Sequence, residues 1–164
     1  MSNFSHIQLL ALDVDGVLTD GKLYYGAEGD VFKAFHAHDG HGLVMLREAG
    51  VQIAIITARQ SEIVSHRMQE LQIPHVFQGQ KDKRRCLQTL LNKLNIDAKQ
   101  TAYVGDDVMD IPAMELVGLR CTVNNAMPAV KAISHYITKR EGGMGAVREI
   151  CDMLIAHRDH KIIA

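Results

Sequence analysis

The stretch LLALDVDGVLTDG, Leu9 to Gly21, carries a strongly apolar run directly into two acidic residues, Asp13 and Asp15. The run is typical of a buried strand, and buried charge is costly unless it is paired, hydrogen-bonded or bound to a metal. Side chains two residues apart on a strand share one face, and Gly16 then allows a sharp turn. The two carboxylates therefore need a compensating partner, although an Asp–Gly pair also occurs in ordinary turns.

Apolar strand-like runs alternate with amphipathic helical segments along the rest of the chain. One helix is expected to begin at Asp39 as its N-cap and to stop at Gly50, and another to begin at Ser61. This alternation is typical of βαβ units and predicts an α/β fold, a Rossmann-like parallel sheet with helices on both faces. The expected strands are 7–12, 51–57, 75–79, 101–105, 119–123 and 135–138.

The segment from Val17 to Phe35 departs from that alternation. Its sequence, GKLYYGAEGDVFKAF from Gly21 onward, predicts two short strands around a turn at Gly26–Gly29, a β-hairpin flap at about 17–35. Ligands of open α/β sheets bind beyond the carboxyl ends of the strands, so the flap would lie at the mouth of a site there. We expect one domain over residues 1–164, ending in a helix at about 145–157.

Composition limits the classes of function. The 164 residues carry a net charge of -1, which gives no overall field for nucleic acid or an anionic membrane. No apolar stretch approaches the ~20 residues of a membrane span, and residues 1–20 lack the basic start of a signal peptide. Cys86, Cys121 and Cys151 are odd in number and widely spaced, which indicates reduced thiols. We therefore expect a cytoplasmic protein without a nucleic-acid or membrane partner.

A second apolar run, TAYVG, ends in three further carboxylates, Asp106, Asp107 and Asp110. One Asp at a helix N-terminus caps backbone N–H groups, and Asp110 fits that alternative, but the adjacent Asp106 and Asp107 exceed what a cap requires. Two strands that each end in an acidic cluster bring mutually repelling carboxylates together. Mg2+ suits a site of few carboxylates with retained waters and phosphate oxygens, so we predict Mg2+ as the cofactor.

Two other strand ends carry groups suited to an anion. In ITAR, Thr57 offers a hydroxyl and Arg59 a planar fork for carboxylate or phosphate. Thr57 could equally cap a helix, and Arg59 could pair with Glu62 on the surface. In QGQKDK, Lys81 and Lys83 lie at a helix start, where cations oppose the helix dipole. We therefore expect one of these two lysines to bind an anion and the other to be a solvated surface residue.

These four features, in this order at consecutive strand ends, resemble the haloacid dehalogenase superfamily of phosphatases. The resemblance implies a Mg2+-dependent phosphomonoesterase in which Asp13 attacks phosphorus and becomes an aspartyl phosphate. It implies that Asp15 protonates the leaving alcohol and then activates the water that clears the intermediate. Thr57 and Lys83 would hold the transferring phosphoryl group.

The same resemblance implies a set of metal ligands. Mg2+ would be held by Asp13, the backbone carbonyl of Asp15 and Asp106, with Asp107 as a further ligand. Asp110 would lie outside the direct ligands. A carboxylate can approach a phosphate dianion only where their repulsion is neutralised, which a metal ion and a lysine would do.

The spacing of the motifs narrows the resemblance. Only the hairpin separates Asp15 from Thr57, which leaves no room for a cap domain. The patterns DVDGVLTDG, F-x-x-x-DG-x-G, QGQ-x-x-K, GDD-x-x-D and GG-x-GA-x-RE are closely similar to a capless family that hydrolyses 3-deoxy-D-manno-octulosonate 8-phosphate. That substrate is a sugar acid phosphate on the route to lipopolysaccharide. The resemblance implies homotetramers with shared active sites, in which hairpins pack around a central axis and C-terminal segments reach a neighbour's site.

Arginines are the candidates for the carboxylate of such a substrate. Arg59 lies beside the phosphate motif, and Arg148 and Arg140 are close enough to the C-terminus to reach a neighbouring site. At helical spacing from Asp152, Arg148 could equally form an exposed ion pair.

The chain departs from the family pattern at Ala58, where Gly is usual, and at His38 and Met144, where a cation is common. A substrate with both a carboxylate and a phosphate would use extra cations, so a nine-carbon sugar acid 9-phosphate or another sugar phosphate stays an alternative. An alternative of another class is an inactive subunit that regulates a sugar-nucleotide synthetase. Zinc at His36, His38 and His41 is disfavoured, because no cysteine lies nearby as a further ligand.

Overall fold

A six-stranded parallel sheet forms the centre of the computed structural model, which describes residues 4–159. Its strands lie in the order β5-β4-β1-β6-β7-β8, and every neighbouring pair is parallel. The α/β prediction is confirmed, and each expected strand is present. The strands are β1 (Leu9–Leu12), β4 (Gln52–Ile56), β5 (His75–Phe77), β6 (Thr101–Gly105), β7 (Leu119–Thr122) and β8 (Tyr136–Ile137).

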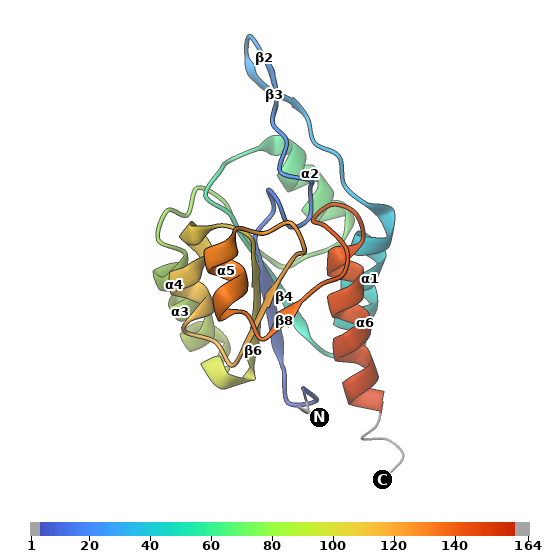
Figure 1. The fold of residues 1–164 in the computed structure, drawn as a ribbon, viewed down its shortest axis with the longest axis vertical. Helices are drawn as coiled ribbons and strands as arrows, with labels where there is room; N and C mark the ends of the chain where they lie inside the picture. Colours follow the sequence, from blue (N-terminus) through green and yellow to red (C-terminus); the bar gives the residue numbers. More distant parts are fainter. Residues whose placement is uncertain (1–3, 160–164) are drawn as a thin grey trace.

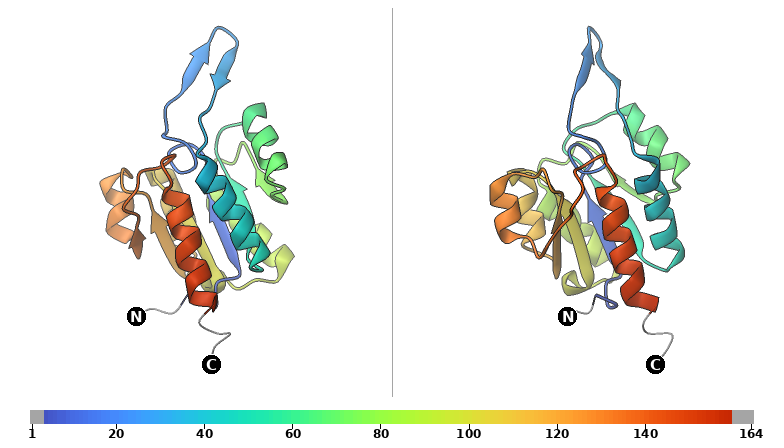
Figure 2. Two further views of the ribbon diagram at one scale, coloured as in Figure 1. Left: turned by 90° about the vertical axis from the view of Figure 1, so that its right-hand side faces the viewer. Right: turned by 45° about the vertical axis from the view of Figure 1, so that its right-hand side comes forward.

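Helices cover both faces of this sheet, as expected (Figure 1). Helices α1 and α6 lie side by side on one face, and α2 covers the same face nearer to β5 (Figure 2). Helices α3, α4 and α5 pack on the other face. Their bounds are α1 (Ala37–Glu48), α2 (Glu62–Glu70), α3 (Lys83–Leu94), α4 (Ile111–Met114), α5 (Pro128–Ile133) and α6 (Ala146–Asp159), with short 3-10 turns η1 (Ala98–Gln100) and η2 (Val108–Asp110).

Alternation along the central strand divides the core in two. Leu10 and Leu12 of β1 point into the cluster beneath α1, α2 and α6. Leu9 and Ala11 point the other way, into the cluster beneath α3, α4 and α5. All four side chains are completely buried, so β1 is fixed from both faces and the residues that follow it start from a rigid position.

The hairpin flap is present as strands β2 (Tyr24–Gly26) and β3 (Gly29–Phe32), paired antiparallel with Gly26 opposite Gly29. It projects from the body at the end opposite to the chain termini (Figure 1). The one-domain organisation over 1–164 stays a prediction, because residues 1–3 and 160–164 lie outside the described part.

One predicted helix cap is wrong. The N-cap of α1 is His36, whose ring nitrogen accepts the His38 N–H, rather than Asp39. Asp39 is buried in the first turn, and its carboxylate accepts the backbone N–H groups of Gly145 and Arg148 at 3.3 and 2.8 Å. It therefore joins the start of α6 to α1, and burial raises its pKa.

Other local predictions are confirmed. Ser61 is the N-cap residue of α2, and Gly50 follows α1 in the left-handed region, at φ 86°. The three cysteines are free thiols, of which Cys121 and Cys151 are buried. Within residues 4–159, no helix combines the length and apolar character needed to cross a membrane.

Candidate active site

The predicted site residues converge at one edge of the sheet. Strand β1 lies between β4 and β6, so the residues that follow these three strands meet beyond their carboxyl ends. A pocket of about 260 Å3 opens there. It brings together every predicted site residue except Arg140 and Arg148. The lining consists of Asp13, Asp15, Gly21, Leu23, Thr57, Ala58, Arg59, Lys83, Asp106, Asp107, Met109 and Asp110.

Lys83, the first residue of α3, is the cation at the centre of the pocket. Its side chain is 2% exposed, and its Nζ lies 2.6 Å from Asp13 Oδ2 and 2.7 Å from Asp110 Oδ1. Burial alone would lower the pKa of Lys83, but the two carboxylates outweigh it and the pKa is raised. Lys81 is exposed. The sequence did not decide which of the two lysines belongs to the site. The structure places Lys83 in the pocket and Lys81 on the surface.

Asp13 is held in place by contacts to both of its carboxylate oxygens. Oδ1 accepts the Val14 N–H at 2.7 Å, and Oδ2 faces Lys83. Burial and the nearby Asp110 raise the pKa of Asp13 to about 6, against the lowering effect of Lys83. One lysine does not balance the negative charge that gathers around this carboxylate.

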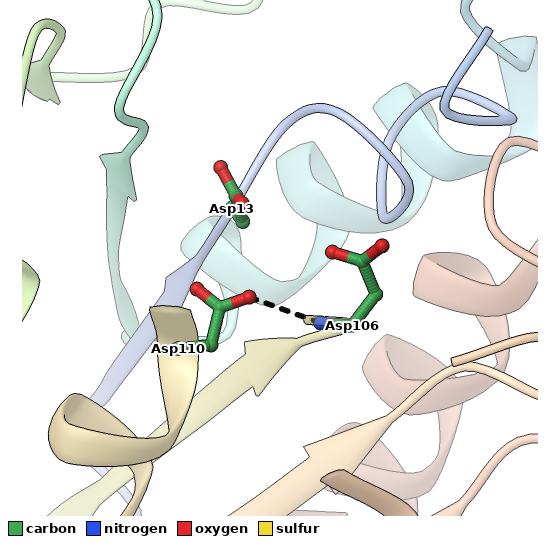
Figure 3. Close-up of side chains that lie close together, drawn as sticks. All are labelled: Asp13, Asp106 and Asp110. Atoms are coloured by element: carbon green, nitrogen blue, oxygen red, sulfur yellow. Dashed lines mark hydrogen bonds between the residues drawn. The ribbon is translucent and has the colours of Figure 1, made fainter. Parts of the chain in front are cut away.

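The negative charge around Asp106 is even less compensated than that around Asp13. Burial, followed by repulsion from Asp110 and Asp13, raises the pKa of Asp106 to about 7. Oxygens of Asp13, Asp106 and Asp110 lie within 4.8 Å of one another, and Figure 3 shows the three side chains around a common centre. A cluster of hard oxygen ligands that is short of positive charge fits Mg2+. These residues therefore match the metal that the sequence predicted.

Asp110 contributes to the acidic cluster but is the least free to bind a metal. Its Oδ1 accepts from Lys83 Nζ and from the Tyr103 hydroxyl, and its Oδ2 accepts the N–H groups of Asp106 and Asp107. Figure 3 shows the Asp106 contact as a dashed line. Four donors thus occupy its two oxygens, and its side chain has no exposure. Its place outside the direct metal ligands stays a prediction.

A close approach of two loops completes the acidic cluster. Gly16 has φ 86°, and a Cβ built at this position would overlap the carboxylate of Asp106. The turn after Asp15 therefore touches the Asp106 side chain only because residue 16 is a glycine. This contact brings the backbone around Asp15 close to the proposed metal ligands.

Asp107 and Thr57 occupy different parts of the pocket wall. Asp107 is exposed and is the N-cap of η2, where its carboxylate accepts the Val108 N–H at 2.7 Å. Asp110, which fitted the cap alternative in the sequence, is the N-cap residue of α4, and its carboxylate accepts the Asp107 N–H in a capping box with Asp107. Thr57 is 2% exposed, and its backbone N–H and carbonyl bond to Phe77 and Gln80. Those bonds hold Thr57 rigidly at the end of β4.

Arg59 lies at the outer side of the pocket, next to the hairpin. Its Nη2 lies 2.9 Å from Asp30 Oδ1 and donates to the Tyr25 hydroxyl at 2.5 Å. Hydrogen bonding to Tyr25, and attraction to Asp30 against the effect of burial, raises the pKa of Arg59. The alternative ion pair with Glu62 is not formed in the described structure.

Lys33 is a charged residue of this region that the sequence reasoning missed. Its Nζ lies 2.5 Å from Asp15 Oδ1, and its side chain is 3% exposed. In the sequence, Lys33 continues the alternation of a hairpin strand, which is typical of a solvated side chain. Its contact with Asp15 depends on how the hairpin folds back, and no local pattern predicts this.

Arg148 lies outside the pocket of its own chain. Its Nε pairs with Asp152 at 2.7 Å, the exposed ion pair that the helical spacing allowed. Arg148 lines a separate cavity of about 440 Å3, together with His38 and Arg140. A role for Arg148 in substrate binding therefore requires a neighbouring chain.

The fold and the acidic edge of the sheet define a hydrolase of the haloacid dehalogenase-like class. The haloacid dehalogenase-like hydrolase family matches residues 73–150. The 3-deoxy-D-manno-octulosonate 8-phosphate phosphatase KdsC of Escherichia coli strain K12 is 45% identical over 150 residues, which are 92% of this chain and 80% of that protein. The chain belongs to the haloacid dehalogenase-like hydrolases and, within them, to the family of the 3-deoxy-D-manno-octulosonate 8-phosphate phosphatases.

Solved structures agree with this assignment. The phosphatase of Moraxella catarrhalis, crystallised in complex with magnesium ion, phosphate ion and a KDO molecule, has a TM-score of 0.92 and 43% identity, covering 98% of this chain and 94% of that one. The cobalt-bound phosphatase of Haemophilus influenzae has a TM-score of 0.94 and 37% identity, covering 96% and 92%. The predicted superfamily therefore matches the relatives over nearly the whole chain.

Proposed function

We propose that the chain hydrolyses 3-deoxy-D-manno-octulosonate 8-phosphate to the free sugar acid and phosphate, with Mg2+ as its cofactor, in the synthesis of lipopolysaccharide precursors. The observation that carries the proposal is the pairing of buried Asp13 with buried Lys83 inside a cluster of hard oxygen ligands. The Moraxella catarrhalis phosphatase, with 43% identity, was crystallised with magnesium, phosphate and KDO, which supports both the cofactor and the substrate.

Asp13 is the proposed nucleophile. Its carboxylate attacks phosphorus, the bond from phosphorus to the sugar oxygen breaks, and an aspartyl phosphate forms. The contacts from Val14 and Lys83 fix the carboxylate for attack, and the Lys83 ammonium stabilises charge on the transferring phosphoryl group. Thr57 lines the same pocket and offers its hydroxyl to a phosphoryl oxygen.

Asp15 is the proposed acid and base. It gives a proton to the departing sugar oxygen, and it later takes one from the water that hydrolyses the aspartyl phosphate. Mg2+, held by Asp13, the Asp15 carbonyl and Asp106 with Asp107 nearby, would neutralise the repulsion between the carboxylates and the phosphate dianion. The buried Asp110 maintains this arrangement by fixing Lys83 and the backbone of the Asp106 loop.

The hairpin supports a proposal about assembly. Leu23, Tyr25, Val31 and Phe32 are all at least 45% exposed on or next to β2 and β3, and an isolated two-stranded hairpin is only marginally stable in water. Adjacent exposed apolar side chains of this kind mark interaction surfaces. We propose a homotetramer in which hairpins pack against one another and Arg148, with Arg140, faces a neighbour's pocket.

Light scattering tests the assembly. The protein is expected to have the mass of four chains, and Val31→Asp is expected to shift it to smaller species, whereas Glu28→Gln at the exposed turn should leave the mass unchanged. A monomeric unmodified protein would rule out the shared sites. The cytoplasmic location remains a prediction.

Phosphate release from a panel of substrates tests the activity. The panel contains the octulosonate 8-phosphate, nine-carbon sugar acid 9-phosphates and hexose phosphates, each with Mg2+ and after EDTA. We expect a strong preference for the eight-carbon acid, loss of activity in EDTA and recovery with Mg2+. Higher rates on a nine-carbon sugar acid 9-phosphate would make that ester the assigned substrate. No release from any ester by folded, Mg2+-supplied protein would favour the inactive regulatory subunit.

A further inference from the structure

Four charged side chains form a closed ring between the hairpin and the pocket. Asp15 Oδ1 contacts Lys33 Nζ at 2.5 Å, and that ammonium lies 3.8 Å from Asp30 Oδ2. Asp30 Oδ1 contacts Arg59 Nη2 at 2.9 Å, and Arg59 Nε lies 3.7 Å from Asp15 Oδ2. Two carboxylates and two cations thus alternate around the ring and balance one another.

The ring joins three segments that are far apart in the sequence. Asp15 follows β1, Arg59 follows β4, and Asp30 and Lys33 belong to the hairpin and its return. Side-chain exposure is 3% for Lys33, 14% for Asp30, 18% for Asp15 and 35% for Arg59, so Lys33 is the most shielded member of the ring. Salt screens partly buried ion pairs less than pairs on the open surface. The ring therefore ties the hairpin to the acid–base residue of the pocket.

The two oxygens of Asp15 are used differently. Lys33 donates a hydrogen bond to Oδ1, whereas Arg59 Nε, the cation next to Oδ2, is beyond hydrogen-bonding distance. Arg59 Nε is itself buried and has no hydrogen-bond partner among the described residues. Asp15 and Arg59 both line the pocket. A polar oxygen of a ligand placed beside Asp15 Oδ2 would therefore find both a carboxyl partner and an unused N–H donor.

We propose that Lys33 is a positioning residue, which holds Asp15 through Oδ1 and directs Oδ2 to the oxygen of the leaving group. The inference rests on the proposed function, because it names the residue that orients Asp15 in the proposed acid–base step. Asp15 enters that step with a proton on Oδ2 while Oδ1 accepts the hydrogen bond from Lys33. The bond from phosphorus to the sugar oxygen then breaks, and that oxygen takes the proton from Asp15 Oδ2. The carboxylate left behind is stabilised by the Lys33 ammonium, and water returns a proton when the aspartyl phosphate is hydrolysed.

The test compares two leaving groups in Lys33→Met. An alkyl sugar phosphate needs a proton on its departing oxygen, whereas p-nitrophenyl phosphate releases a phenolate that is stable without one. The kcat/KM value reports the reaction up to departure of the leaving group, so it isolates this step. We expect Lys33→Met to lower kcat/KM for the sugar phosphate by ~10- to 100-fold and that for p-nitrophenyl phosphate by less than ~3-fold.

Matched variants separate positioning from general damage. Lys22→Met removes a lysine from the other arm of the same hairpin segment, where the side chain is 72% exposed, and it should change neither value. Lys33→Arg retains the charge and should recover part of the activity on the sugar phosphate. Light scattering and thermal melting of each variant report whether the assembly and the fold persist.

Each outcome decides a different point. An equal loss on both substrates, or no loss on either, would overturn the role of Lys33. If the unmodified protein released phosphate from neither substrate, the proposed function itself would fail. A larger loss on the sugar phosphate alone, with Lys22→Met unchanged, would establish that the hairpin contributes to leaving-group departure.

Discussion

Two buried lysines hold the two ends of the pocket, and they do so in different ways. Lys83 starts α3, lies between Asp13 and Asp110, and is fixed to the core beneath the sheet. Lys33 lies between Asp15 and Asp30 on a hairpin that projects from the body. Both side chains are at most 3% exposed. Lys83 belongs to a helix packed on the central sheet, whereas Lys33 follows a strand of the projecting hairpin.

The difference separates two tasks. Around Lys83 the chain gathers more carboxylates than one lysine can balance, and this raises the pKa of Asp13 and Asp106. That end suits a divalent cation and a phosphoryl group. Around Lys33 the charges balance as they stand, so the ring needs no metal. That end suits the orientation of a carboxyl group toward a leaving group.

The largest expected effect is the loss of the nucleophile at the Lys83 end. Asp13→Asn should reduce turnover by ~10^4-fold or more, because an amide cannot form the aspartyl phosphate. The shape and the contact from Val14 are retained, so the fold should persist. Phosphate-release assays and circular dichroism melting measure the two quantities, and turnover near that of the unmodified protein would rule out Asp13 as nucleophile.

Removal of the core lysine should cost stability as well as activity. Lys83→Met leaves Asp13 and Asp110 buried without their cation, and breaking a buried pair costs ~3–5 kcal/mol. Lys81→Met changes an exposed lysine two residues earlier and should stay within ~0.5 kcal/mol of the unmodified protein. Urea unfolding compares the two variants, and equal stabilities would show that the Lys83 network does not support the fold.

A matched pair of glycine substitutions tests the approach of the two loops. Gly16→Ala and Gly29→Ala both place a Cβ at positive φ, but only Cβ16 meets the carboxylate of Asp106, whereas Cβ29 meets open space. Both should lose ~1–3 kcal/mol from backbone strain. Gly16→Ala should also weaken Mg2+ binding by ~10-fold. Calorimetric titration with Mg2+ tests this, and equal affinities in the two variants would contradict the contact.

The smallest expected effect is on the pH dependence of Mg2+ binding. Without metal, the pKa is about 6 for Asp13 and about 7 for Asp106, above the ordinary 3.8, so the native state binds protons more tightly than the unfolded chain. The metal-free protein should therefore lose stability as pH rises from 4 to 7. Mg2+ displaces those protons, so its stabilising effect should grow over the same window.

Melting temperatures measured with and without Mg2+ at pH 5.5 and pH 8 test how the stabilisation by Mg2+ depends on pH. We expect a rise of several degrees at pH 8 and a smaller one at pH 5.5. Asp106→Asn removes the group with the higher pKa and should flatten the difference. A Mg2+ effect that is larger at pH 5.5 would contradict the assignment of these carboxylates as ligands.

Much of the site could be predicted because parallel strands place their ends together. Once β1, β4 and β6 are identified from apolar runs, the sheet order brings Asp13, Thr57 and Asp106 to one edge whatever the details of packing. The choice between Lys81 and Lys83 needed the structure, because it depends on which side of the first turn of α3 faces the sheet.

The rest depended on contacts between distant segments. Asp39 has the local sequence of an N-cap but caps α6 instead of α1, because packing of the two helices offers its carboxylate better donors. Lys33 reaches Asp15 only when the hairpin folds back. In both cases a charged side chain meets a partner more than 15 residues away, and local patterns carry no information on such pairs.

The most direct test is to trap the covalent intermediate. The protein, supplied with Mg2+ and the octulosonate 8-phosphate, is quenched in acid during turnover, digested and examined by mass spectrometry. One phosphoryl group on the peptide that contains Asp13, absent from Asp13→Asn, is the predicted result. A phosphoryl group on another residue, or none during measured turnover, would contradict the account of Asp13 as the nucleophile at the Lys83 end of the pocket.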